Sequence, residues 1–186
     1  MPIVPIANFS HLIAHLKLLD IELLQIHSSI KNSRDPGSGG LFDRGEYFIG
    51  HGFIAIQTYF AIAYPITGIR KSEALEIPPL IGHGLSLMEA INAGANYWKH
   101  QEEWGLKAVV EKDIDALKKQ ARETVLTIEK LTPWADYTCS NLLAAMLGDS
   151  ARIELSPLLP LILEWENNIL NMPDPVKVGS EVERKN

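Results

Sequence analysis

The stretch ANYWKHQEEW, residues 95–104, gathers an amide, an amine, an imidazole and a carboxylate at Asn96, Lys99, His100 and Glu103. On a helix, Asn96 and His100 lie one turn apart, so both side chains can reach one ligand. Glu103 can select the tautomer of the His100 ring or raise its pKa, and Lys99 adds a positive charge nearby. Such residues can move a proton and bind a phosphate. They also suit the solvated face of an amphipathic helix, and spacing alone favours that second interpretation.

A helix predicted to follow Pro78-Pro79 and to end near Trp104 must position this stretch. At 100° per residue, five polar residues fall on one stripe about 60° wide. They are Glu89, Asn92, Asn96, His100 and Glu103. The opposite side is apolar and is expected to face the core, through Leu87, Met88, Ile91, Ala95 and Trp98. We therefore predict that His100 belongs to a continuous polar face.

Apolar spacing predicts further helices on both sides of this one. Residues 12–30 repeat Leu or Ile in steps of three and four, with Asn8 or Ser10 as a cap, and the loop at residues 32–40 follows. Residues 43–64 are apolar nearly all round, which is typical of a central helix, and three glycines there would let a neighbouring helix approach closely. Later helices are predicted at about residues 112–131, 135–147 and 157–170, the last with Ser156 as its N-cap.

These elements predict an all-α fold, because no period-2 strand pattern outweighs them. We expect a four-helix-type bundle over residues 8–131 and a C-terminal extension of two shorter helices over residues 132–171. Residues 172–186 are polar, contain two prolines and are expected to form a loose tail.

Composition narrows the class of protein. A chain of 186 residues that is 46% hydrophobic and 22% charged suits one sizeable core. The net charge of −6 gives no general basic field, so a nucleic acid would need a local basic patch. The single cysteine, Cys139, excludes an intrachain disulfide, suits a cytoplasmic setting and is expected in the core. Residues 47–69 carry no formal charge, yet their His, Gln, Gly and Pro content favours a buried helix over a membrane span.

Histidines on the first helix raise the possibility of a metal site. His11 and His15 lie one turn apart and could bind zinc with a third ligand from His51 or His83. Metal-dependent bundles of the DinB kind are similar in ligand type, but they place a single His early and a His pair late. Boundary positions on a helix explain His11 and His15 more simply. We therefore expect no cofactor and keep the metal site as a minor alternative.

The stretch ANYWKHQEEW resembles NYxKHxxEW, which is found in several branches of the HEPN superfamily. These are small helical-bundle proteins of prokaryotic toxins and phage-defence systems, and the order of elements over residues 8–131 is similar to theirs. The resemblance implies a homodimer and, for active members, a metal-independent ribonuclease with its motif at the dimer interface. That motif has an Arg, a polar neighbour and a later His. Here the His is His100, the polar residue is Asn96, and Ala95 stands at the Arg position.

The Ala95 departure weakens the case for catalysis. Cleavage of RNA requires proton transfer at the attacking 2′-OH and a cation for the developing phosphorane charge. His100 would supply the first function, whereas the second would fall to Lys99, or to Arg44 or Arg70 from elsewhere. Two hypotheses therefore stand. The favoured one is a non-catalytic toxin- or defence-type module that binds RNA or a partner protein, and the alternative is a ribonuclease that uses His100.

Overall fold

A computed structural model describes residues 8–106, 114–148 and 153–172. Over these ranges the chain is mainly α-helical, so the predicted all-α class is confirmed. The α-helices are α1 (Phe9–Asn32), α2 (Leu41–Ala63), α3 (Lys71–Glu76), α4 (Leu87–His100), α6 (Lys119–Glu129), α7 (Thr138–Leu147) and α8 (Leu159–Leu170). Short 3₁₀ turns add η1 (Tyr64–Thr67), η2 (Ile114–Ala116) and η3 (Ser156–Leu158). A small hairpin consists of β1 (Leu80–Gly82) and β2 (Leu85–Ser86).

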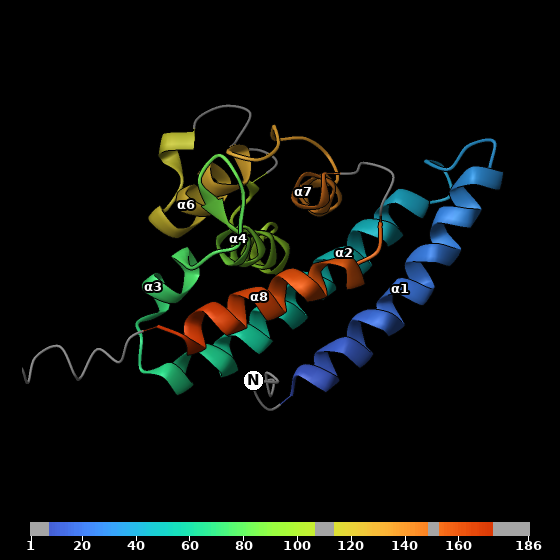
Figure 1. The fold of residues 1–186 in the computed structure, drawn as a ribbon. Helices are drawn as coiled ribbons and strands as arrows, with labels where there is room; N and C mark the ends of the chain where they lie inside the picture. Colours follow the sequence, from blue (N-terminus) through green and yellow to red (C-terminus); the bar gives the residue numbers. More distant parts are fainter. Residues whose placement is uncertain (1–7, 107–113, 149–152, 173–186) are drawn as a thin grey trace, which may run out of the picture.

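Helix α1 forms where the apolar repeat of residues 12–30 predicts a helix. Leu12, Leu16, Leu23 and Ile26 are buried, and α1 runs along the outer side of α2 (Figure 1). Asn8 stands at the N-cap position with φ 88°, but its side chain makes no capping hydrogen bond. The predicted Asn8 side-chain cap is therefore wrong, and at this end of α1 the Asn8 main-chain carbonyl accepts hydrogen bonds from the N–H groups of His11 and Leu12 at 3.0 and 3.1 Å.

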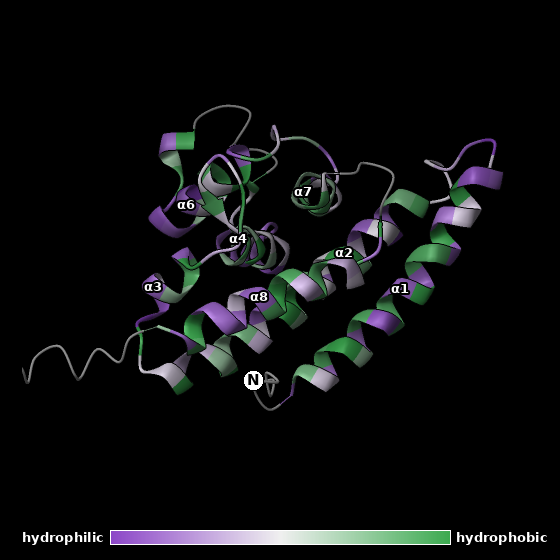
Figure 2. Ribbon diagram, in the orientation of Figure 1, coloured by the Kyte–Doolittle hydropathy of each residue, from purple (hydrophilic) through white to green (hydrophobic). Residues whose placement is uncertain are grey.

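Helix α2 is the central element. It packs against α1 on one side and against α4 and α7 on the other, and its ribbon is largely hydrophobic (Figure 2). Two glycines make close packing possible, since a Cβ at Gly50 would overlap the Trp98 ring and one at Gly52 would overlap Leu155. Gly45 has only an ordinary contact with Ile26. The prediction of close helix approach is thus confirmed at Gly50, where α4 lies close, whereas the residue against Gly52 belongs to the segment just before η3.

The predicted helix after Pro78-Pro79 is wrong at its start. The antiparallel strands β1 and β2 come first, and His83 and Gly84 make the turn between them with positive φ angles of 48° and 73°. Helix α4 begins only at Leu87 because a capping box precedes it. The Ser86 hydroxyl accepts a hydrogen bond from the Glu89 N–H at 3.1 Å, and the Ser86 N–H donates to Glu89 Oε2 at 2.8 Å.

Other element boundaries also differ from the predictions. Helix α4 ends at His100, and the residues up to Gly105 form turns. The connector at residues 65–79 contains η1 and α3. The helix expected at 112–131 begins at Lys119 in the described chain, and residues 107–113 lie outside it. Residues 172–186, the predicted tail, lie outside it except for residue 172, and the domain boundary at residue 131 stays a prediction.

Two buried carboxylates attach the C-terminal elements to the first two helices. Asp20 of α1 accepts hydrogen bonds from the Leu155 N–H at 2.6 Å, from the Ser156 N–H at 3.1 Å and from the Ser156 hydroxyl. Ser156 therefore does not act as the predicted N-cap, because its hydroxyl is donated to Asp20. Glu46 of α2 accepts from the Cys139 N–H at 2.6 Å, and from the Ser140 N–H and hydroxyl at 2.9 and 2.7 Å. Both carboxylates thus cap the N-terminus of another helical element.

The apolar core is continuous across these elements. It extends from α1 and α2 through α4 and α6 to α7 and α8, where Trp165 is fully buried and donates its indole N–H to the Ala74 carbonyl at 2.9 Å. Cys139 is also fully buried, which confirms its expected place in the core. Among the helices of the described ranges, none is both long and apolar enough to cross a membrane.

We expect Asp20→Ala to lower the free energy of unfolding by about 3 kcal/mol, because charge-assisted hydrogen bonds to buried N–H groups are lost. Urea unfolding followed by circular dichroism measures this change. Glu123→Ala is the matched control, since that carboxylate is 63% exposed and lies 3.8 Å from Lys119 Nζ. Its effect should stay below about 0.5 kcal/mol. Equal effects of the two substitutions would contradict the capping role of Asp20.

Candidate functional site

His100 lies at the last residue of α4 and is turned toward the segment that follows. Its Nδ1 lies 2.9 Å from Glu103 Oε2, and its ring stacks on Trp104 with 4.9 Å between the centroids and 20° between the planes. The His100 side chain is 34% exposed. Because Nδ1 is engaged by a carboxylate, Nε2 is the nitrogen that remains for contact with another molecule.

Two residues of the predicted polar face, Asn92 and Asn96, point toward α2. The Gln57 amide nitrogen donates to Asn92 Oδ1 at 2.9 Å and to Asn96 Oδ1 at 3.0 Å. Lys99 Nζ in turn donates to Gln57 Oε1 at 2.8 Å. Asn92 and Asn96 are half-buried, so a solvated face is the wrong interpretation for them. Burial lowers the pKa of Lys99, and the positive charge of Lys71 adds to this effect.

Asn96 and His100 therefore serve different partners. The side-chain oxygen of Asn96 accepts a hydrogen bond from Gln57, whereas the His100 ring contacts Glu103 and Trp104. Ala95, at the position where the HEPN motif carries its Arg, is fully buried on the core side of α4. A cation at this position would lie in apolar surroundings and not beside the His100 ring.

The two arginines that could replace the motif Arg lie elsewhere. Arg44 is exposed in the first turns of α2. Arg70 precedes α3 and binds Glu73, with its Nε 2.9 Å from Glu73 Oε1, and this hydrogen bond raises the pKa of Arg70. Within the described part of the chain, no hydrogen bond or ion pair joins either arginine to His100.

The three histidines of the alternative metal site line one groove of about 540 Å³ between α1 and α2. His11 and His15 come from α1 and His51 from α2. His51 Nδ1 lies 2.8 Å from the Tyr47 carbonyl oxygen, and His83 is in the distant hairpin turn. In the described residues, no group of three or more His, Cys, Asp or Glu is placed to hold a metal ion. The geometry therefore gives the metal-enzyme alternative no support.

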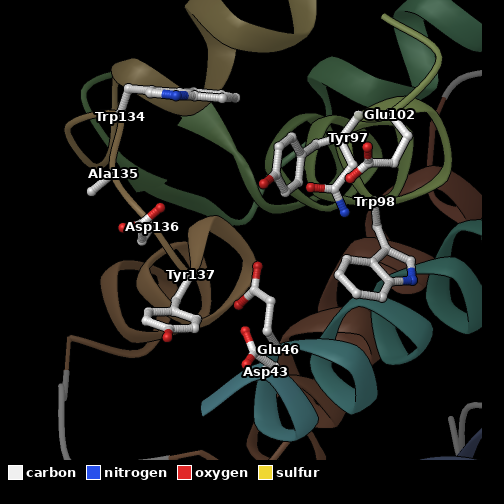
Figure 3. A pocket seen from close by; sticks show the side chains of 10 residues that line it. Asp43, Glu46, Tyr97, Trp98, Glu102, Trp134, Ala135, Asp136 and Tyr137 are labelled. Carbon is white, nitrogen blue, oxygen red and sulfur yellow. The ribbon is translucent and has the colours of Figure 1, made fainter. Parts of the chain in front are cut away.

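A pocket of about 740 Å³, larger than this groove, lies beside the end of α4 (Figure 3). Three segments line it: the start of α2, the end of α4 and the residues just before α7. The lining residues are Asp43, Glu46, Tyr97, Trp98, Gln101, Glu102, Trp134, Ala135, Asp136 and Tyr137. The described lining thus holds four carboxylates and four aromatic rings and no basic side chain.

Packing fixes three of these rings. The Tyr97 and Trp134 rings meet edge to face, with 5.4 Å between their centroids. Trp98 lies over Gly50 and contacts the rings of Tyr47 and His51, each with a centroid distance of 5.9 Å. In Figure 3 the two tryptophans stand on opposite sides of the pocket, and Glu46 and Tyr97 point toward its middle.

The pocket has a negative electrostatic field. Burial raises the pKa of Tyr97 to about 12, and the charges of Glu46 and Asp136 contribute to the rise. The pKa of Tyr137 is also raised, first by burial and then by Asp43, Asp136 and Glu46. Both phenols therefore sense the same group of carboxylates, which favours a positively charged ligand.

No local sequence pattern marks this pocket. Asp43, Glu102 and Asp136 are far apart along the chain and stand in three unrelated contexts. Among the lining residues, only Asp136 and Tyr137 in the sequence WADY, residues 134–137, are an acidic and an aromatic residue next to one another, and such a tetrapeptide is not a motif by itself.

Comparison of the chain with protein-family models, with curated proteins and with solved structures finds no match. The HEPN resemblance of ANYWKHQEEW therefore stays a hypothesis.

The buried thiol beside the pocket leads to a pH prediction. Burial raises the pKa of Cys139 well above its ordinary 9.0, and Glu46 contributes. The folded protein thus keeps a proton that the unfolded chain loses near pH 9, so stability is complete below that pH and falls above it. We expect the free energy of unfolding to fall by about 1.4 kcal/mol per pH unit from this group alone.

Cys139→Ala provides the comparison. Urea unfolding between pH 8 and 10 should give a steeper loss of stability for the natural protein than for the variant. Above about pH 10 both should lose stability further, because burial also raises the pKa of Tyr59 and Tyr97. Parallel curves between pH 8 and 10 would contradict the assignment to Cys139.

Proposed function

We propose that this protein is a non-catalytic HEPN-like binding module that holds a partner protein at the end of α4. The contacts and the burial of the motif residues support this proposal. Asn96 and Lys99 are committed to Gln57 of α2, and the position of the motif Arg is the buried Ala95. An active ribonuclease would need these groups turned together toward a phosphate.

Charge favours a protein partner over RNA. The pocket beside the motif stretch presents Asp43, Glu102 and Asp136, and the whole chain has a net charge of −6. Affinity for nucleic acid comes mainly from basic groups that replace counterions on phosphates. Carboxylates around the α4 end would repel RNA and attract a basic protein surface.

Homodimer formation belongs to the proposal and is supported by α1. This helix lies at the outer side of the bundle (Figure 1), and three apolar side chains on it face away from the core. Leu18, Ile21 and Leu24 are 65%, 53% and 48% exposed. Pairing of two copies through this face would remove them from water. A cytoplasmic toxin or defence system is the setting that the HEPN resemblance suggests.

One contact favours the second candidate function, a metal-independent ribonuclease. The hydrogen bond from Glu103 would orient His100 so that Nε2 takes the proton of an attacking 2′-OH. Lys99 would then have to leave Gln57 and balance the charge of the phosphorane. This rearrangement breaks a contact between α2 and α4, which makes the ribonuclease the weaker candidate.

Incubation of the protein with a mixed RNA in EDTA decides between the two functions. We expect no cleavage, because the motif groups are engaged inside the fold. His100→Ala and the matched control His15→Ala, at an exposed position of α1, are assayed in parallel. Cleavage that is lost in His100→Ala and kept in His15→Ala would establish the ribonuclease and overturn the non-catalytic proposal.

A further inference from the structure

We infer that the pocket between α2, α4 and the start of α7 binds an organic cation, an alkylammonium or guanidinium group on a basic side chain of the partner. This inference rests on the proposed function and names the chemistry that the module recognises. It depends on three properties of the pocket: its unbalanced charge, its aromatic walls and its size.

Three carboxylates in the lining have no charge partner among the described residues. No ion pair in the described ranges involves Asp43, Glu102 or Asp136, and all three residues are exposed. Glu46 differs, because the N-terminus of α7 already engages both of its oxygens. Glu46 therefore holds the pocket floor in place, while the other three carboxylates remain for a ligand.

The aromatic walls favour an organic cation over a metal ion. Trp98 and Trp134 are half-buried, so each ring keeps accessible surface toward the pocket. Indole rings attract ammonium and guanidinium groups that approach their faces, and they also contact the adjoining methylene groups. The described acidic residues are not grouped closely enough to hold a metal ion.

Size points to a side chain with part of its backbone. The volume of about 740 Å³ exceeds the space that a lone ammonium group needs. It lies within the range of about 300–1,000 Å³ that is typical of ligand pockets. A lysine or arginine side chain of a peptide would fit, and a free polyamine has the same chemistry, so the experiment must separate these two sources.

The full-length protein is titrated with three probes: a blocked trilysine peptide, spermidine and a blocked triglutamate peptide. Binding is followed by calorimetry and by tryptophan fluorescence, because Trp98 and Trp134 line the pocket and contribute to the emission. We expect saturable binding of trilysine, weaker binding of spermidine and none of triglutamate.

Substitutions locate the binding. No hydrogen bond joins the Asp136 carboxylate to another described residue, so Asp136→Asn removes one charge and breaks no such contact. A double variant combines it with Asp43→Asn. The double variant should weaken trilysine binding by about tenfold, and Trp134→Leu by about fivefold. Glu164→Gln is the control, because that exposed carboxylate is on α8 outside the pocket. The affinity of this variant for trilysine should stay within about twofold of that of the natural protein. Circular dichroism verifies that each variant is folded.

Each result has one meaning. Absence of trilysine binding, or equal affinity in the Asp43/Asp136 variant and the control, would overturn the inference. Binding of spermidine without trilysine would overturn the assignment to a partner side chain. Cleavage of RNA in the earlier assay would overturn the proposed function but would leave trilysine binding intact, so the two failures are distinguishable.

Discussion

Burial of two carboxylates, Asp20 and Glu46, is the constraint on which much of the structure depends. A carboxylate that leaves water is strongly destabilising unless donors replace its hydration, and here the donors are backbone N–H groups at the starts of η3 and α7. Those N–H groups would otherwise lack partners, so each interaction satisfies both sides. Glu46 also places the segment before α7 opposite the end of α4. The pocket exists because this cap brings its two walls together.

A second constraint acts between α2 and α4. Gly50 allows the Trp98 ring to lie against the α2 backbone, and Gln57, seven residues further along α2, binds Asn96 and Lys99 through its side-chain amide. An amide with donor and acceptor atoms satisfies both an asparagine and a lysine, which makes the polar contact specific for one register. The side chains that looked suited to chemistry therefore hold two helices together. His100, beyond this contact, is left to Glu103 and Trp104.

The end of α4 thus presents two chemically different sides. Lys99 and His100 face Gln57 and Glu103, whereas Trp98 and Glu102 line the acidic pocket. The pocket side has more unbalanced charge than the motif side, and its sign is negative. A helix end that resembles a ribonuclease motif by its residue types can therefore be better suited to a cation than to a phosphate. The proposed recognition of a basic partner rests on this difference in the charge of the two sides.

Local periodicity determined the helices of this protein but not the positions of its functional groups. The apolar repeat of α1 and the sequence Ser86-x-x-Glu89 act within one or two turns, so the sequence alone predicts the first helix and contains the signal for the start of α4. The tetrapeptide IGHG occurs twice and shows the limit of local sequence, because residues 49–52 lie within α2, whereas residues 81–84 form the end of β1 and the hairpin turn. Asp43, Glu102 and Asp136 share no local signal. Only packing of α2, α4 and α7 brings them to one pocket, since contacts between distant segments depend on the whole core and not on neighbouring residues.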